Sequence, residues 1–270
     1  MRKEKKLIMI GAIFGDIAGS KYEFGNIRRK DFELLSDDCY FTDDTVCTFA
    51  CLDWLLTAKE RTEETAKEYL LKWCLAYPRK GYGGRFAQWI TSKKHRPYHS
   101  FGNGAAMRIS PVAYFAKNLE ELKYLSDTFT KITHNHEEGM KGALTVSTII
   151  FMALHHSSKE EIKEYALKQY PRIKDLDYET LVQTYEFNET CQGSIPEAIY
   201  CFLISKDFED NARTTISVGG DSDTTTCISS AIAEAYYGMP KKFKDRTRDF
   251  LTNDMKFYLD LFEARMKSES

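Results

Sequence analysis

The sequence predicts an all-α protein that folds as a single-domain, compact helical bundle. Apolar residues recur at helical spacing in most segments, and strand-like alternation is almost absent. The 270 residues contain no Pro/Gly/Ser-rich linker or low-complexity run that would mark a domain boundary. We therefore expect one domain over residues 1–270, large enough to bury a substantial core.

The first helix is predicted from apolar residues at helical spacing, namely Leu7, Ile10, Ile13, Phe14 and Ile17. Gly11, Gly15 and Gly19 are offset from one another by four positions, so they form a ridge of small residues on this helix. Such a ridge predicts close contact with a neighbouring helix. The segment then reaches Glu23.

The middle of the chain alternates predicted helices with glycine-rich turns. Residues 46–56 fit a buried helix, and residues 65–76 fit an amphipathic one. Residues 81–91 predict a glycine-rich turn that runs into a short helix. Residues 98–108 form a second glycine-rich loop, expected to open a helix that continues through Phe115.

The second half of the chain continues the helical pattern. Residues 124–131 and 137–156 predict two helices on either side of a short polar break. Two later helix starts match the capping box, one at Ser158 with Glu161 and one at Ser194 with Glu197. An apolar stretch at 227–237 predicts a further buried helix.

Composition excludes several classes of protein. Apolar residues at 43%, charged residues at 29% and a net charge of −2 are ordinary for a soluble globule and offer no basic face for nucleic acid. Seven cysteines with no C-x-x-C pair indicate reduced thiols rather than a disulfide framework or a zinc site. The early apolar run stops at Asp16 without a cleavage site, and no stretch could span a membrane. We expect a cytoplasmic monomer with no membrane partner.

Two distant segments repeat one chemistry, because each places clustered carboxylates beside threonine hydroxyls. They are Thr42-Asp43-Asp44-Thr45 and Gly219-Gly220-Asp221-Ser222-Asp223-Thr224-Thr225. Hard oxygen donors of this kind suit Mg²⁺, Mn²⁺ or Ca²⁺, so the pair of segments predicts a site for two divalent ions. Helix capping is the alternative, since each segment precedes an apolar stretch. Capping needs only one acidic side chain, whereas adjacent carboxylates repel unless a cation or proton compensates them.

Three further features are candidate ligand contacts, and each has an ordinary structural alternative. The loop Ser100-Phe101-Gly102-Asn103-Gly104 supplies N–H groups, a hydroxyl and an amide suited to a diphosphate, or it is a plain tight turn. His134 is expected to contact a ligand, although it and His136 could equally be a surface or core pair, or bind zinc. Glu23 follows a helix end, where carboxylates are usually solvated.

Taken together, these motifs resemble the ADP-ribosylglycohydrolase family, of the dinitrogenase-reductase-activating glycohydrolase type. The resemblance runs from about residue 8 to residue 240 and has its motifs in the family's order. It rests on the two acidic segments and on Gly11-Ala12-x-x-Gly15-Asp16-x-x-Gly19-x-x-x-Glu23, Gly81-Tyr82-Gly83, Ser100 to Arg108 and Thr133-His134. Residues 171–191 match no motif, so the resemblance leaves substrate specificity to them or to residues 22–40.

The resemblance implies a fold and a set of site residues. The fold is an all-α bundle around two Mg²⁺ or Mn²⁺ ions, held by Thr42, Asp43, Asp44, Asp221, Asp223, Thr224 and, from a mobile flap, Glu23. Glu23 would alternatively be the catalytic carboxylate. The substrate contacts would be Gly83, Ser100, Phe101, Gly102, Asn103, Gly104 and His134.

The implied activity is metal-dependent hydrolysis of the glycosidic bond between ADP-ribose and an acceptor. The partner would be an ADP-ribosylated protein or a small ADP-ribosyl conjugate, while nothing in the sequence supports a nucleic-acid end. Two rivals use the same residues: another metal-dependent nucleotide hydrolase, and a non-catalytic ADP-ribose-binding protein. The sequence leaves the acceptor open among arginine, serine, nucleic acid and O-acetyl-ADP-ribose.

Overall fold

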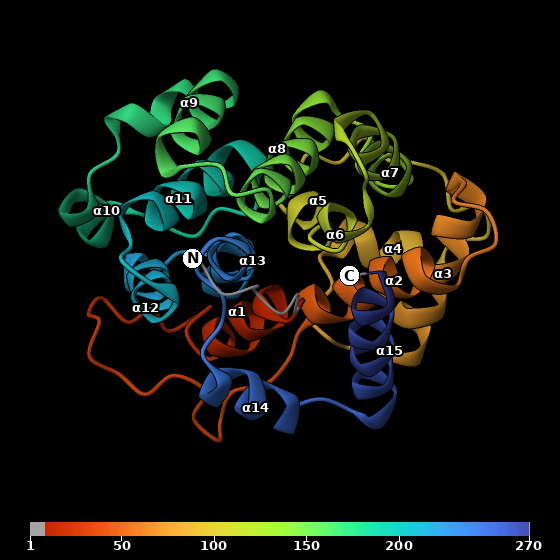
Figure 1. The fold of residues 1–270 in the computed structure, drawn as a ribbon, viewed down its shortest axis with the longest axis horizontal. Coiled ribbons are helices and arrows are strands. Elements are labelled where there is room, and N and C mark those ends of the chain that lie inside the picture. The colour runs from red at the N-terminus through yellow and green to blue at the C-terminus, as the bar shows by residue number, and fades with distance from the viewer. Residues whose placement is uncertain (1–8, 270) are drawn as a thin grey trace.

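The computed structural model describes residues 9–269, and within them every regular element is a helix. The elements are α1 (Gly11–Ser20), α2 (Asp43–Thr57), α3 (Glu63–Ala76), α4 (Gly84–Thr91), α5 (Gly104–Met107), α6 (Val112–Phe115), α7 (Leu119–Lys131), α8 (Glu137–Leu154), α9 (Lys159–Gln169), the 3₁₀ helix η1 (Pro171–Asp175), α10 (Tyr178–Thr184), α11 (Cys191–Ile204), α12 (Phe208–Val218), α13 (Ser222–Tyr237), α14 (Lys241–Asp249) and α15 (Asn253–Glu269). The all-α prediction is confirmed (Figure 1). Leu7 and the two ends of the predicted domain lie outside the described residues.

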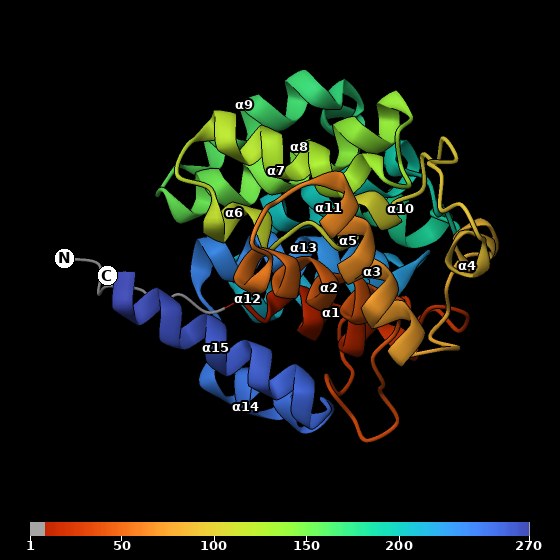
Figure 2. The same cartoon turned by 90° about the vertical axis from the view of Figure 1, so that its right-hand side faces the viewer.

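Helix α13 forms the centre of the bundle. It packs against α1, α8, α11 and α12, and Figure 1 shows α1 and α12 beside it. Helices α14 and α15 lie on the outside, and Figure 2 shows α15 running along one edge of the molecule. One hydrophobic cluster extends from Met9 on the N-terminal side to Met266 in α15. A smaller one forms around Leu181, Cys201 and Val218.

The glycine ridge of α1 lies directly on the backbone of α13, as the spacing of the glycines predicts. A Cβ atom at Gly15 would lie 2.1 Å from the carbonyl oxygen of Thr226. At Gly19 it would lie 2.3 Å from Ser222 O, and at Gly11 it would lie 2.5 Å from the corresponding oxygen of Ser230. Main-chain atoms of the two helices therefore lie in direct contact at all three glycines of α1.

The predicted helix from residue 104 to residue 115 is two helices rather than one. Helix α5 ends at Met107, and α6 begins at Val112. Pro111 precedes α6 and lacks the N–H that a continuous helix would need, and its ring disfavours helical backbone at Ser110. The chain bends here, so Arg108 turns back toward α5 instead of continuing along a helix.

The two predicted capping boxes have different outcomes. Ser158 forms one, because Glu161 N donates to Ser158 Oγ (3.2 Å) and Ser158 N donates to Glu161 Oε2 (2.7 Å). The prediction at Ser194 is wrong. Helix α11 starts earlier, at Cys191, with Thr190 as its cap, and the hydroxyl of Ser194 donates to Thr190 O (2.7 Å). The capping-box pattern recurs by chance inside a helix that has a better cap upstream.

A buried carboxyl group caps the start of α1. Glu234 on α13 accepts hydrogen bonds from Ile10 N (3.0 Å to Oε2) and Gly11 N (2.7 Å). These N–H groups have no partner within the helix, so a side chain must satisfy them. Burial raises the pKa of Glu234 to about 8, although the two hydrogen bonds oppose the rise.

This cap makes stability depend on pH. The folded pKa of Glu234 lies above the ordinary value of 4.5, so its contribution is fully present below about pH 4.5 and is lost as the pH rises through about 8. Glu234→Gln keeps an acceptor oxygen but cannot ionise. We expect the melting temperature to fall less between pH 5 and pH 9 in this variant than in the wild type. Calorimetry at both pH values measures this, and parallel pH profiles would show that Glu234 is not the titrating group.

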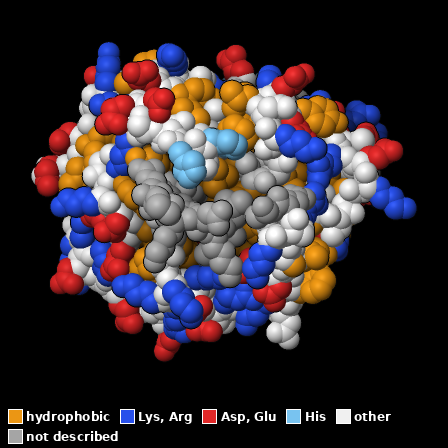
Figure 3. All heavy atoms as spheres, in the orientation of Figure 1, with side chains coloured by type: hydrophobic (Ala, Val, Ile, Leu, Met, Phe, Trp, Pro, Cys, Tyr) orange, Lys and Arg blue, Asp and Glu red, His pale blue; other side chains and the backbone are white. Residues whose placement is uncertain are grey.

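Figure 3 shows one face of the molecule with charged side chains spread around its edge. Basic and acidic side chains are interspersed there, in keeping with the net charge of −2. Within residues 9–269, no helix combines the length and the apolar character needed to cross a bilayer. All seven cysteines are free and buried.

Candidate functional site

Asp16 anchors the first acidic segment, although the sequence patterns assigned it no role of its own. It lies fully buried on α1, and its carboxylate accepts hydrogen bonds from Thr42 N (2.9 Å), Thr42 Oγ1 (2.7 Å), Thr45 N (3.0 Å) and Thr45 Oγ1. Burial raises the pKa of Asp16, and these hydrogen bonds oppose the rise. Asp16 thereby ties the start of α2 to α1. An acidic residue amid the apolar residues of a helix was the signal for it.

Thr42 caps the helix that carries the first acidic segment. It is the N-cap of α2, because its Oγ1 accepts from Asp44 N (3.3 Å) while donating to Asp16. Asp43 and Asp44 occupy the first turn of the helix, where its dipole favours negative charge. Thr42 by itself caps the helix, so capping does not explain why two carboxylates follow it.

The second acidic segment lies next to a third carboxylate from the loop after α1. One oxygen atom from each of Glu23, Asp221 and Asp223 lies within 4.8 Å of the others. Asn103 Nδ2 donates to Asp221 Oδ2 (2.6 Å) and fixes its orientation. The backbone N–H of Thr224 donates to Asp223 Oδ1 (2.9 Å). Converging carboxylate oxygens are ligands that suit a hard divalent cation.

Asp44 connects the two acidic segments. Thr224 Oγ1 donates to Asp44 Oδ2 (3.3 Å), across the contact between α2 and α13. The other oxygen, Asp44 Oδ1, is buried and has no hydrogen-bond partner among the described residues. A buried carboxylate oxygen without a partner is costly, and a cation would supply what it lacks. The donor set therefore fits a divalent metal.

The pKa shifts of the cluster have one main cause, which is burial. Burial raises the pKa of Asp43 to about 7, although Arg108 opposes the rise, and it raises that of Glu23 to about 7. The pKa values of Asp44 and Asp223 are raised well above their ordinary range, first by burial and then by neighbouring carboxylates. A bound cation would reverse these shifts by stabilising the ionised forms.

The carboxylates line a pocket of about 420 Å³. The predicted residues that line it are Glu23, Asp43, Asp44, Gly83, Ser100, Phe101, Gly102, Asn103, Gly104, His134, Asp221, Asp223 and Thr224. Of the predicted site residues, only Thr42 lies behind the lining, as the cap of α2. The sequence patterns missed Arg85, Tyr98, Arg108, Phe187, Glu189 and Thr190.

The loop from Ser100 to Gly104 already uses three of the N–H groups that suggested a diphosphate cradle, and one of these bonds runs from Ser100 N to Thr133 O (3.5 Å). Gly102 N donates to Ser100 Oγ (3.2 Å), and Asn103 N donates to Glu189 O (2.8 Å). Cys191 N also donates to Phe101 O (2.9 Å), so the loop pairs with the segment before α11. These N–H groups are therefore already paired, and side chains would have to supply part of any anion binding.

Two side chains beside this loop suit an anionic ligand. Arg108 is buried, its guanidinium lies 4.8 Å from the ring centre of Phe86, and its Nη1 has no hydrogen-bond partner among residues 9–269. Burial lowers the pKa of His134 well below its ordinary value, so its ring is neutral. Its Nδ1 lies 2.7 Å from Thr133 Oγ1, which leaves Nε2 for a ligand.

His136 does not join His134 in a metal site. Its Nδ1 accepts from Glu138 N (3.0 Å) and caps α8. Its ring lies 5.2 Å from that of Phe101, which is 38% exposed at the pocket. His134 and His136 therefore have different hydrogen-bond partners, and their arrangement does not support a shared zinc site.

A sequence profile of the ADP-ribosylglycohydrolase family matches residues 6–269, nearly the whole chain. The chain belongs to the ADP-ribosylglycohydrolase family. Its relatives include the mouse protein "ADP-ribosylhydrolase ARH3", which is 27% identical over 92% of this chain and 88% of its own length. The human protein of the same name is also 27% identical, over 86% of this chain and 84% of its own length.

More distant similarities agree with membership of the family. The "ADP-ribosyl-[dinitrogen reductase] glycohydrolase" of Rhodospirillum rubrum is 25% identical over 51% of this chain and 47% of its own length. A solved structure titled "ADP-ribosylglycohydrolase-related protein complex" superposes with a TM-score of 0.69, at 21% identity, over 96% of this chain and 95% of that one. This structural similarity establishes that the fold is shared.

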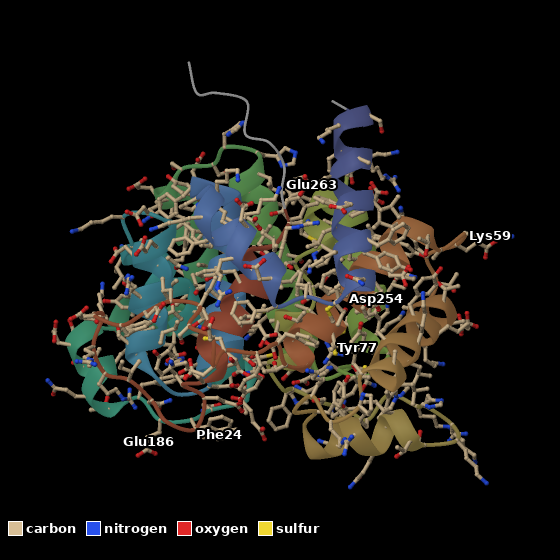
Figure 4. The ribbon with its side chains drawn as sticks, turned by 90° about the horizontal axis from the view of Figure 1, so that it is seen from below. Phe24, Lys59, Tyr77, Glu186, Asp254 and Glu263 are labelled. Atoms are coloured by element: carbon tan, nitrogen blue, oxygen red, sulfur yellow. The ribbon has the colours of Figure 1, made fainter. Side chains whose placement is uncertain are left out.

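In this member of the family, the two segments to which substrate specificity was left, residues 22–40 and 171–191, contact each other beside the pocket. The rings of Phe24 and Phe187 stack with their centres 6.2 Å apart and their planes 22° apart. They are 84% and 48% exposed, and Figure 4 shows Phe24 beside Glu186 at the edge of the molecule. Exposed, paired aromatic rings at a pocket mouth are typical of a contact surface for a ligand.

Proposed function

We propose that the chain is a metal-dependent ADP-ribosyl glycoside hydrolase, which cleaves the N- or O-glycosidic bond between ADP-ribose and an acceptor. The observation that carries the proposal is a pocket of about 420 Å³ whose lining combines two kinds of chemistry. It contains carboxylates that suit cations, together with a glycine-rich loop, Arg108 and His134. A ligand with a diphosphate and a ribose diol matches both kinds.

The metal site would hold two Mg²⁺ or Mn²⁺ ions through Asp43, Asp44, Asp221, Asp223, Thr224 and Glu23, with Thr42 in support. When bound, such cations hold hydroxyl groups in place and lower the pKa of water. The remaining tasks fall to the protein. Asn103 fixes Asp221, and Asp16 holds the start of α2, so the carboxylates are oriented before the substrate arrives.

The remaining lining would bind the rest of ADP-ribose. Gly83, Ser100, Phe101, Gly102, Asn103 and Gly104 border this part of the pocket together with His134. Neutral His134 offers Nε2, and the unpartnered Nη1 of Arg108 places positive charge under the loop. Both features favour an anionic ligand without requiring a change of protonation.

The acceptor would leave past Phe24 and Phe187. Phe187 lines the same pocket as Glu23, and Phe24 stacks on Phe187. We infer an ADP-ribosylated protein or a small ADP-ribosyl conjugate as partner. The free, buried cysteines favour a reducing compartment, as in the cytoplasm.

Turnover of defined substrates tests the function. Purified protein with Mg²⁺ is incubated with arginine-linked and serine-linked ADP-ribosyl peptides, O-acetyl-ADP-ribose and ADP-ribosylated nucleic-acid ends, and the products are separated by chromatography. We expect free ADP-ribose from at least one substrate, and none after EDTA. Release of phosphate would instead indicate another nucleotide hydrolase. Binding of ADP-ribose without turnover would indicate a non-catalytic protein.

Glu23 is proposed as the catalytic acid or base, or as a metal ligand. Glu23→Gln keeps its size but removes its charge, so kcat should fall by about 10²-fold or more while ADP-ribose affinity changes little. Measuring kcat across a Mg²⁺ titration separates the two roles. Higher Mg²⁺ restores turnover if Glu23 is chiefly a ligand and does not if it transfers a proton. Near-wild-type turnover at ordinary Mg²⁺ would remove Glu23 from the site.

A further inference from the structure

Asn26 lies three residues after Glu23 and bridges two segments that are far apart in the sequence. Its side-chain Nδ2 donates to Gly220 O (3.0 Å), and its Oδ1 accepts from Gly220 N (2.9 Å). The same Nδ2 lies 2.6 Å from Tyr22 O and 3.3 Å from Glu23 O. One amide group therefore contacts the backbone of Tyr22 and Glu23 and also that of Gly220, the residue that precedes Asp221.

The Gly219-Gly220 turn is shaped to receive this amide. Both glycines have positive φ, at 78° and 74°. A Cβ at Gly219 would lie 2.9 Å from Asn26 Oδ1 and 2.6 Å from the guanidinium carbon of Arg28. Arg28 in turn donates to Val218 O and to Tyr185 O (2.7 Å). The side chains of Asn26 and Arg28 thus hold the loop against the turn, and no residue larger than glycine fits at Gly219.

These contacts matter because the Glu23 carboxylate lies close to two other carboxylates. Its carboxylate lies within 4.8 Å of oxygens of Asp221 and Asp223, and the next residues, Phe24 and Gly25, are exposed. When these carboxylates are ionised, repulsion between them favours movement of an unrestrained loop away from the cluster. A hydrogen-bonded anchor between Glu23's own carbonyl and the residue before Asp221 opposes that movement directly.

We propose that Asn26 is a positioning residue, which holds the Glu23 carboxylate against Asp221 and Asp223 by joining its loop to the Gly219-Gly220 turn. The proposal rests on the metal site of the proposed function, and it assigns Asn26 no contact with the substrate. Supporting residues of this kind change metal affinity or activity by about 10- to 100-fold when they are lost.

The test compares Asn26→Ala with Asn118→Ala. Asn118 caps α7 by accepting from Glu121 N (2.9 Å), so its loss removes an asparagine hydrogen bond away from the pocket. We expect Asn26→Ala to lower kcat by about 10-fold or more with little change in KM, and to weaken Mn²⁺ binding in calorimetry by about 10-fold. Asn118→Ala should change neither, although both variants lower the melting temperature.

A double-mutant cycle identifies the route of the effect. If Asn26 acts through Glu23, adding Asn26→Ala to Glu23→Gln should lower kcat by less than about 3-fold further. Asn26→Asp keeps the acceptor but loses the donors, so it should behave like Asn26→Ala. Losses that multiply in the double variant, or a kcat and Mn²⁺ affinity within 2-fold of wild type in Asn26→Ala, would overturn the proposal.

Proteolysis gives a readout that needs neither metal nor turnover. Arg28, Arg29 and Lys30 follow Asn26 and are tryptic sites in the same loop. We expect Asn26→Ala to be cut there about 10-fold faster than the wild type in EDTA, and Asn118→Ala to be cut at the wild-type rate. If the wild type neither binds Mn²⁺ nor releases ADP-ribose, the proposed function fails. An unchanged rate of cutting refutes the anchoring by Asn26 whatever the activity.

Discussion

Replacing Asp44 with asparagine should abolish turnover and at the same time stabilise the metal-free protein. The variant loses one charge from the cluster, so cation binding should weaken strongly and kcat should fall by about 10³-fold or more. Without a cation, the unpartnered Asp44 Oδ1 and the neighbouring carboxylates make the cluster unfavourable. Removing one charge should therefore raise the unfolding free energy by about 1 kcal/mol or more.

Two measurements check this pair of opposite effects: turnover in Mg²⁺, and thermal unfolding in EDTA. Glu234→Gln provides a control, because it replaces another buried carboxyl group with an amide, outside the pocket lining, and should leave kcat unchanged. A variant that loses activity and stability together would indicate that Asp44 has a structural role, and full activity would exclude it from the metal site.

Gly15→Ala should destabilise the fold more than any surface substitution. The new Cβ would lie 2.1 Å from Thr226 O and 2.4 Å from the carbonyl carbon of the same residue, so α1 must separate from α13. Both obstructing atoms belong to the backbone and cannot rotate away. We expect a loss of about 3 kcal/mol or more in the free energy of unfolding, measured by urea denaturation, and a drop of about 6 °C or more in melting temperature.

Gly84→Ala is the matched control, since it makes the same change at a helical glycine. A Cβ at Gly84, the first residue of α4, meets no atom within 4 Å. Alanine is favoured over glycine in helices by about 0.5–1 kcal/mol, so this variant should be as stable as the wild type or slightly more so. Equal effects at Gly15 and Gly84 would contradict the backbone contact between α1 and α13.

Local signals in the sequence predicted most of the fold. Helical periodicity located the long elements, and the glycines of α1 predicted a close neighbour, which is α13. The errors occurred where a second local signal, itself visible in the sequence, overrode the first. Pro111 interrupted an otherwise helical stretch, and Thr190 provided a better cap than Ser194.

Part of the candidate site was likewise visible in the sequence, and part was not. The acidic segments and the loop from Ser100 to Gly104 were visible as motifs, and the structure places them around one pocket. Asp16 and Arg108 belong to the longer motifs Gly11 to Glu23 and Ser100 to Arg108, where each is a charged residue among apolar ones. That pattern indicated a role for both residues, and both are buried. Glu189 left no local signal, because it reaches the pocket through backbone pairing of its carbonyl with Asn103 N.

The backbone contact between α1 and α13 also bears on which ion the proposed site would accept. Ca²⁺ requires oxygen ligands at about 2.3–2.6 Å, whereas Mg²⁺ takes them at about 2.0–2.1 Å. Asp16 on α1 fixes the start of α2 and so Asp44, while Asp223 belongs to α13. Widening the space between these carboxylates for a larger ion would mean lifting Gly15 and Gly19 off α13. Because main-chain atoms set the distance between the two helices, only side-chain rotation is left to accommodate a larger ion, and we expect the proposed site to bind Mg²⁺ more tightly than Ca²⁺.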